Sequence, residues 1–187
     1  AVGYFSLYTN TTGAQNVALG SQALGLNTTA SNNTAVGYTA LTANTTGASN
    51  VALGHSALFS NTTASYNTAV GYQSLYSNAG AGVSLVAVGH QAGYSFNGGG
   101  SNQAQVFIGK SAGYCNVSGI DNTYVGGYAG YNATGSYNTA LGSGALLSQT
   151  SASSNTAVGY QALTAATTAD SNTAIGDYTA VSTTTGI

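Results

Sequence analysis

A six-residue motif of the form N-T-A-V-G-Y recurs along the whole chain and limits what it can fold into. Its glycine falls at eleven places: Gly3, Gly20, Gly37, Gly54, Gly71, Gly89, Gly109, Gly126, Gly142, Gly159 and Gly176. The intervals are 17 residues four times, then 18, 20, 17, 16, 17 and 17. A short fixed period predicts one small supersecondary unit stacked many times. We therefore expect residues 1–187 to form a single elongated repeat array.

Composition separates an ordered array from a disordered chain. Disordered segments combine low hydrophobicity with high net charge, whereas this chain is 43% hydrophobic and carries a formal net charge of −2. We therefore expect an ordered chain.

The single lysine of the chain argues against binding to nucleic acids or to anionic membranes, because both draw affinity from Lys and Arg. No apolar run has the length of a transmembrane helix, and no signal-peptide pattern is present, so we expect no membrane contact by this segment.

The repeat can be read as 17 positions, with residues 35–51 (AVGYTALTANTTGASNV) as the model unit. Position 1 is Ala in nine repeats, position 2 is always a branched aliphatic residue, position 3 is always Gly, and position 7 is Leu in seven repeats. Alternating side chains bounded by Asn and Gly predict a five-residue strand over positions 17 to 4. Positions 5 to 9 are expected to form a second short strand, and positions 10 to 13 (N-T-T-G/A) the return turn. We expect positions 2, 7 and 17 to form a thin core, and the Ala and Gly side of the first strand to contact another chain.

These features predict an all-β fold, a parallel β-solenoid or β-roll of eleven coils. Coils spaced about 4.8 Å apart would give a rod roughly 50 Å long. Asparagines aligned at position 16 should hydrogen-bond along the stack; they are Asn16, Asn33, Asn50, Asn67, Asn122, Asn138, Asn155 and Asn172. Residues 78–137 are the irregular part, because they contain the longest repeats and replace the position 7 leucine with Gly93, Gly113 and Gly130.

The stretches SNNTAVGYTAL, ASNVALGHSAL, SYNTAVGYQSL and SSNTAVGYQAL carry a family resemblance. They resemble the N-S-V-A-I-G repeats in the heads of trimeric autotransporter adhesins, and more closely the N-T-A-V-G-Y arrays of phage tail fibres and related bacterial surface proteins. The resemblance covers all eleven repeats. It implies a left-handed parallel β-roll that assembles as a homotrimer on a virion or bacterial cell surface and acts in attachment. The unit here is longer than the typical head repeat, with the added residues in the N-T-T-G turn.

Three groups of residues are candidates for binding or modification. Aromatic side chains recur at position 8 and could form a strip that binds sugar rings or host surfaces: Tyr8, Phe59, Tyr76, Tyr94, Tyr114 and Tyr131. The longest repeat suggests a loop patch, since insertions in solenoids map to loops: Asn97, Asn102, Gln103 and Gln105. N-T-T sequons recur every 17 residues, either as glycan acceptors or simply as turn residues: Asn10, Asn27, Asn44 and Asn61.

The sequence offers no arrangement suited to catalysis, so we expect a non-enzymatic protein without metal or cofactor. The two histidines, His55 and His90, both occupy position 4, where Tyr is also frequent, which is typical of a part-exposed stacking position. The three aspartates are scattered rather than paired as carboxylate hydrolysis requires. Cys115 is alone and forms no disulfide framework.

The leading functional hypothesis is an extracellular structural or adhesive fibre module, on a virion or cell surface, that binds copies of itself and a host glycan or protein. Because the chain starts and stops within the repeat, we expect it to be a window on a longer array. One alternative is an ice-binding solenoid, although Thr45 and Thr46 are adjacent in a turn and would point in opposite directions. Another is the subunit of a self-assembling extracellular filament.

Overall fold

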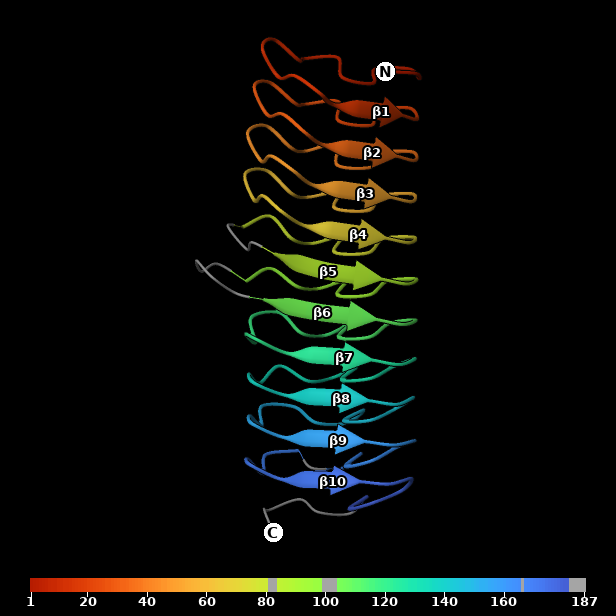
Figure 1. Ribbon diagram of the computed structural model, residues 1–187, viewed down its shortest axis with the longest axis vertical. Coiled ribbons are helices and arrows are strands. Elements are labelled where there is room, and N and C mark those ends of the chain that lie inside the picture. Colours follow the sequence, from red (N-terminus) through yellow and green to blue (C-terminus); the bar gives the residue numbers. More distant parts are fainter. Residues whose placement is uncertain (81–83, 99–103, 166, 182–187) are drawn as a thin grey trace.

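The predicted all-β solenoid is confirmed by the computed structural model, which describes residues 1–80, 84–98, 104–165 and 167–181. Ten strands form one parallel sheet in sequence order (Figure 1). They are β1 (Val17–Leu19), β2 (Thr34–Val36), β3 (Val51–Leu53), β4 (Thr68–Val70), β5 (Leu85–Val88), β6 (Gln105–Ile108), β7 (Thr123–Val125), β8 (Thr139–Leu141), β9 (Thr156–Val158) and β10 (Thr173–Ile175). In the first repeat Val2 makes only an isolated bridge to Leu19, in place of an eleventh strand.

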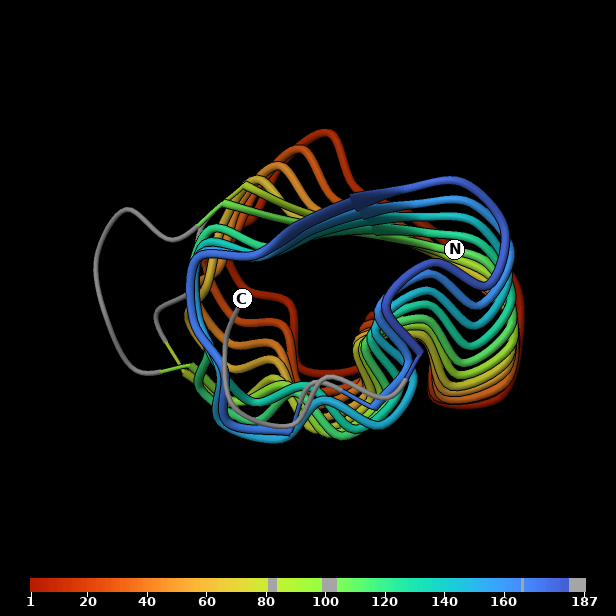
Figure 2. The same ribbon diagram turned by 90° about the horizontal axis from the view of Figure 1, so that it is seen from below.

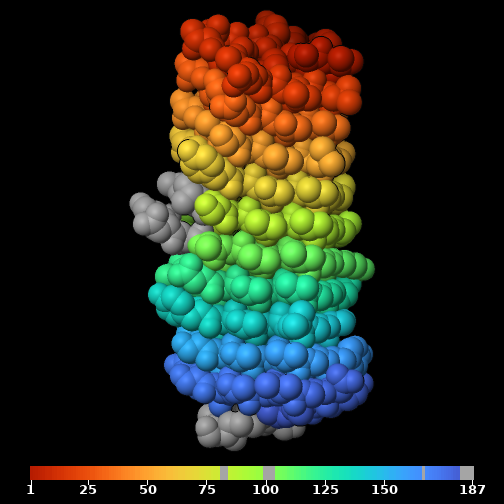
Figure 3. Space-filling model, in the orientation of Figure 1, coloured from red at the N-terminus to blue at the C-terminus, as the bar shows by residue number. Residues whose placement is uncertain are grey.

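Each strand pairs in register with the equivalent positions of the next repeat. Ala35 of β2 lies opposite Ala52 of β3, and this alignment recurs along the sheet. The register persists through the longest repeats, where Leu85 of β5 is opposite Gln105 of β6. The described coils therefore stack as successive bands of one rod (Figure 3). Within the described ranges, no helix is long and apolar enough to cross a membrane.

The expected orientation of the strand was wrong, because the alanine side faces the interior. Ala35, Ala52 and Ala69 at position 1 are fully buried. By contrast, Leu19 and Leu53 at position 2 are 48% and 40% exposed. Alternation correctly separates the two faces of the strand, but positions 2 and 17 point outward. The thin core consists instead of position 1 together with positions 6 and 7, for example Ala57 and Leu58.

The expected second strand was also wrong, because positions 5 to 9 form a compact turn. In the third coil, Thr39 and Leu41 have φ values of 53° and 53°, in the left-handed region, and equivalent residues of other coils repeat this conformation. A residue with positive φ interrupts an extended strand. The alternation of left-handed residues folds this segment into the lobe seen at one side of the coil in Figure 2. The position 7 leucine is thereby directed into the interior, where Leu41 is fully buried.

The glycine at position 3 joins the strand to this turn. Gly54 has a φ of 134°, which is unfavourable for residues with a side chain. A Cβ at Gly54 would lie 2.5 Å from the carbonyl oxygen of Gly71 in the next coil. Both the conformation and the close stacking explain why every repeat has Gly here.

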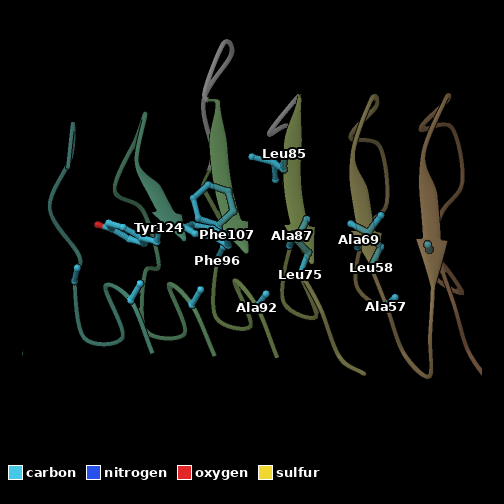
Figure 4. Packing of buried hydrophobic residues seen from close by; sticks show 14 of the residues in the cluster. Ala57, Leu58, Ala69, Leu75, Leu85, Ala87, Ala92, Phe96, Phe107 and Tyr124 are labelled. Atoms are coloured by element: carbon cyan, nitrogen blue, oxygen red, sulfur yellow. The ribbon is translucent and has the colours of Figure 1, made fainter. Parts of the chain in front are cut away.

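Large side chains replace the usual core pair in the middle of the rod. Phe107 and Tyr124 occupy position 1, where most coils have Ala, and both are fully buried. A Cβ at Gly113 would lie 2.5 Å from the Phe107 ring, and one at Gly130 would lie 2.6 Å from the Tyr124 ring. The aromatic ring therefore fills the space that the position 7 leucine fills elsewhere (Figure 4).

Two columns of buried amides run along the interior. At position 16, the backbone N–H of Asn50 donates to Oδ1 of Asn33 (2.9 Å), and the N–H of Asn67 donates to Oδ1 of Asn50 (2.9 Å). The predicted position 16 ladder is therefore confirmed. A second ladder at position 10 was not predicted: Nδ2 of Asn44 donates to Oδ1 of Asn27 (3.0 Å), and Nδ2 of Asn61 donates to Oδ1 of Asn44 (2.9 Å). Burial of the asparagines named above is tolerated because they bond to one another. In the irregular coils the position 10 column is less complete, since Asn78 Oδ1 and both amide atoms of Asn116 are buried without a hydrogen-bond partner.

Candidate functional site

Exposed aliphatic side chains line the outer side of the sheet, which we call the aliphatic face. It consists of the position 2 column, Val2, Leu19, Val36, Leu53, Val70, Val88, Ile108, Val125, Leu141, Val158 and Ile175, beside a position 17 column of Val and Thr. Exposure within the position 2 column reaches 66% at Val2 and 70% at Ile175. Contiguous exposed apolar patches on soluble proteins mark interaction sites. Charged groups are absent from both columns in every coil.

The position 8 aromatics form a second surface feature, the aromatic stack, made of Phe59, Tyr76, Tyr94, Tyr114 and Tyr131. Neighbouring ring centroids lie 5.0, 5.1, 5.0 and 5.2 Å apart, and neighbouring planes are within 10° of each other. All five side chains are half-buried. Partial burial, with the neighbouring tyrosines as a smaller cause, raises the pKa of Tyr94. The inner rings of the stack are thus covered on both faces by their neighbours.

Tyr8, the sixth expected member of the strip, is separate from the stack. The two intervening coils have Gly25 and Thr42 at position 8, so the column of rings is interrupted. Tyr8 instead contacts Phe5, with ring centroids 4.6 Å apart, and is 69% exposed.

The position 4 column adds a shorter run of rings. Tyr38 and His55 lie 5.1 Å apart, His55 and Tyr72 5.2 Å, and Tyr72 and His90 5.2 Å between ring centroids. The two histidines therefore occupy exposed stacking positions, as expected. The His55 ring is further held by a hydrogen bond between Nδ1 and the hydroxyl of Ser56 (2.9 Å).

The expected loop patch is not assembled as predicted. Asn97 is exposed, and its Oδ1 accepts a hydrogen bond from the N–H of Ala79 (3.1 Å). Gln105, in contrast, is fully buried at position 16, where its amide bonds to the carbonyl of Gly119 and to the N–H of Asn122. It takes the place of an asparagine in the interior ladder, so it belongs to no surface patch. Asn102 and Gln103 lie outside the described residues.

The asparagines of the N-T-T sequons, interpreted either as glycan acceptors or as turn residues, lie largely inside the coil. Asn27, Asn44 and Asn61 are fully buried, and their Nδ2 atoms donate within the position 10 ladder. A glycan is attached at this nitrogen, so the folded coils leave no room for one. Asn10 is half-buried at the start of the same ladder, and its Nδ2 donates to the carbonyl of Gly13 (2.9 Å).

The few reactive and charged groups are dispersed. Nζ of Lys110 lies 5.2 Å from the centroid of the Tyr128 ring, an arrangement suited to a cation–π contact, and the Tyr128 hydroxyl raises the pKa of Lys110. Cys115 is half-buried and unpaired, and burial raises the pKa of its thiol. Among the described residues, no three His, Cys, Asp or Glu side chains are close enough together to hold a metal ion.

Sequence reasoning missed the aliphatic face because it assigned position 2 to the core. One signal could have corrected this assignment. Positions 16 and 1 share a face of the strand, and a ladder of asparagine amides is stable only where neighbouring coils shield it. Asn at position 16 therefore indicates that Ala at position 1 also faces inward.

Comparison of the chain with protein-family models, with curated proteins and with solved structures found no match.

Proposed function

We propose that the chain is a structural and adhesive fibre module of a virion or bacterial surface, in which three copies pack their aliphatic faces around a common axis. The supporting observation is the exposed aliphatic face, which runs the length of the described sheet. Burying apolar surface contributes about 25 cal/mol per Å². A face built from one branched residue in every coil therefore gains from association in proportion to the length of the array.

The absence of charge on this face also favours contact with identical copies. Copies related by a rotation axis present the same surface to each other. A charged column would place like charges together at such an axis, whereas Val, Leu, Ile and Thr introduce no repulsion. The aromatic stack and the position 4 rings use other residues, so they would remain available for attachment to a host-surface glycan or protein.

The test is the mass of the assembled chain, measured by sedimentation equilibrium. We expect a trimer for the native chain. Leu53→Asp places a charge in the centre of the aliphatic face and should give a folded monomer with an unchanged far-UV circular dichroism spectrum. Thr12→Asp changes an exposed turn residue in the same array and should leave the trimer intact. A native chain that is monomeric at high micromolar concentration would refute the trimer.

A second candidate function, ice binding, is favoured by one observation on the same face. Six strands begin with an outward threonine at position 17, two residues before the position 2 aliphatic: Thr34, Thr68, Thr123, Thr139, Thr156 and Thr173. These threonines share one strand face, unlike Thr45 and Thr46, which lie in the turn. They are contiguous from Thr123 to Thr173, whereas valine interrupts the column in earlier coils. Ice binding requires this face to be free, so the two functions are mutually exclusive. A monomeric chain with thermal hysteresis, lost in Thr68→Asp, would support ice binding; a trimer without hysteresis excludes it.

A further inference from the structure

A pocket of about 310 Å³ opens beside the turn segments of the first three coils. It is lined by Phe5, Tyr8, Gln22, Gly25, Leu26 and Thr42. This volume lies at the lower end of the range for small-ligand sites. None of the lining residues belongs to the aliphatic face, so the pocket is independent of the proposed assembly.

The pocket occupies the part of the position 8 column in which the chain supplies no ring. Tyr8, Gly25 and Thr42 are the position 8 residues of three consecutive coils, and Phe59 begins the aromatic stack in the next. In coils four to eight, this groove is filled by side-chain rings at centroid spacings of 5.0 to 5.2 Å. At Gly25 and Thr42 the same backbone geometry leaves it open.

The walls define the chemistry of an occupant. Phe5 and Tyr8 provide aromatic surfaces, Leu26 provides an aliphatic one, and no charged residue lines the pocket. The hydroxyl of Thr42 is already used, since it donates to the carbonyl of Gln22 (2.8 Å). Among the lining side chains, only the Gln22 amide and the Tyr8 hydroxyl are left to bind the many hydroxyls of a sugar. A flat ring needs only the stacking surface that the adjacent coils already provide.

We propose that this pocket binds a neutral aromatic ring, which lies over Gly25 and against Tyr8 and extends the aromatic stack toward the first coil. The ring can come from a free aromatic molecule or from a tyrosine or phenylalanine side chain of a protein. The shared requirement is a flat uncharged ring that fits the spacing between coils.

The proposal is tested by NMR titration of the full chain with phenol, followed at the backbone amides of Gly25 and Leu26. We expect saturable shifts confined to the first three coils. N-acetyltyrosinamide tests the side-chain source, and binding tighter than that of phenol would assign it. Cyclohexanol and methyl β-glucopyranoside are the comparators, and we expect both to bind at least tenfold more weakly. Equal binding of either comparator, or no saturable shift with phenol, overturns the proposal.

Two pairs of variants separate occupancy of the pocket from changes elsewhere. The double variant Gly25→Tyr/Thr42→Tyr supplies the missing rings and should abolish phenol binding. Thr164→Tyr introduces a tyrosine at position 8 far along the rod and should leave phenol affinity within twofold of the native value. Tyr8→Ala removes one wall and should weaken binding at least tenfold, while Tyr66→Ala, at a residue 65% exposed, should not. Unchanged binding in both Tyr8→Ala and the double variant also overturns the proposal.

Discussion

Two coils pair an aromatic residue at position 1 with glycine at position 7, where most coils pair alanine with leucine. This compensation makes a quantitative prediction. Phe107→Ala removes a fully buried ring and should destabilise the rod by about 3–5 kcal/mol through lost burial and the resulting cavity. Gly113→Leu alone inserts a side chain whose Cβ would lie 2.5 Å from two Phe107 ring carbons. Overpacking of this kind should cost about 1–3 kcal/mol.

The double variant Phe107→Ala/Gly113→Leu should be more stable than Phe107→Ala. It recreates the alanine–leucine pair found in other coils, such as Ala52 with Leu58. The backbone is compatible, because Gly113 has a φ of 62° and Leu58 adopts 50° at the same position. A residual cost of about 2 kcal/mol is expected from the space left beside Gly93, where the Phe107 ring packs in the native chain. The Phe107→Ala and Gly113→Leu variants should lose about 4 and about 2 kcal/mol of stability, and the double variant only about 2 kcal/mol. The coupling free energy between the two substitutions is then about −4 kcal/mol, which exceeds the usual range for contacting residues.

The free energies are best measured by native-state hydrogen exchange, because repeat arrays need not unfold in one step. The amide of Cys115, which donates to the carbonyl of Tyr131 (2.8 Å), reports on the coil without being altered. Urea denaturation provides the global comparison. If the destabilisation of the two single variants is additive in the double variant, Phe107 and Gly113 do not fill a common space in the core.

Further predictions concern the ladders, the glycine column and the thiol. Asn50→Ala leaves the buried N–H of Asn67 without its acceptor and should cost about 3 kcal/mol in urea denaturation, whereas Thr12→Ala in the exposed turn should change stability by less than about 0.5 kcal/mol. Gly54→Ala forces a Cβ against the next coil and should cost at least about 3 kcal/mol, read as faster amide exchange in the flanking coils; native-like exchange would contradict the close stacking. Since burial raises the pKa of Cys115 above its unfolded value, the folded chain retains this proton at higher pH. Stability should therefore fall as the pH rises above about 8.5, and iodoacetamide should react more slowly at pH 8 with the folded than with the urea-unfolded chain.

The period of the sequence was sufficient to predict the parallel coil and its register. Equivalent residues recur every 17 positions, so the strands must align when the coils stack, and the position 16 asparagines then form a ladder. The inner and outer faces were harder to assign. A branched aliphatic column is the obvious choice for a core, but the interior of this coil is too narrow for it once two amide ladders and the position 7 leucines are accommodated.

Two residue patterns could have revealed the interior in advance. Phe107 and Tyr124 appear at position 1 in the repeats that have Gly113 and Gly130 at position 7. Such compensation indicates that the two positions face each other across the core. The turn at positions 5 to 9 had no comparable signal, because leucine in a left-handed conformation is contrary to its intrinsic preference. It is imposed by hydrogen bonds to neighbouring coils, such as that from the N–H of Leu41 to the carbonyl of Ala57 (2.9 Å).

The left-handed residues of that turn and of position 15 have a consequence for how the rod forms. In the described part of the chain, 27 non-glycine residues have positive φ, generally at positions 5, 7 and 15 of a coil. Each such residue costs about 1–3 kcal/mol in isolation, so a coil with three of them carries a penalty of at least about 3 kcal/mol before it has any neighbour. Only stacking on an existing coil repays this penalty. Formation of the array should therefore begin at a rare nucleus of several coils and proceed by templated growth, and fragments shorter than that nucleus should remain unfolded.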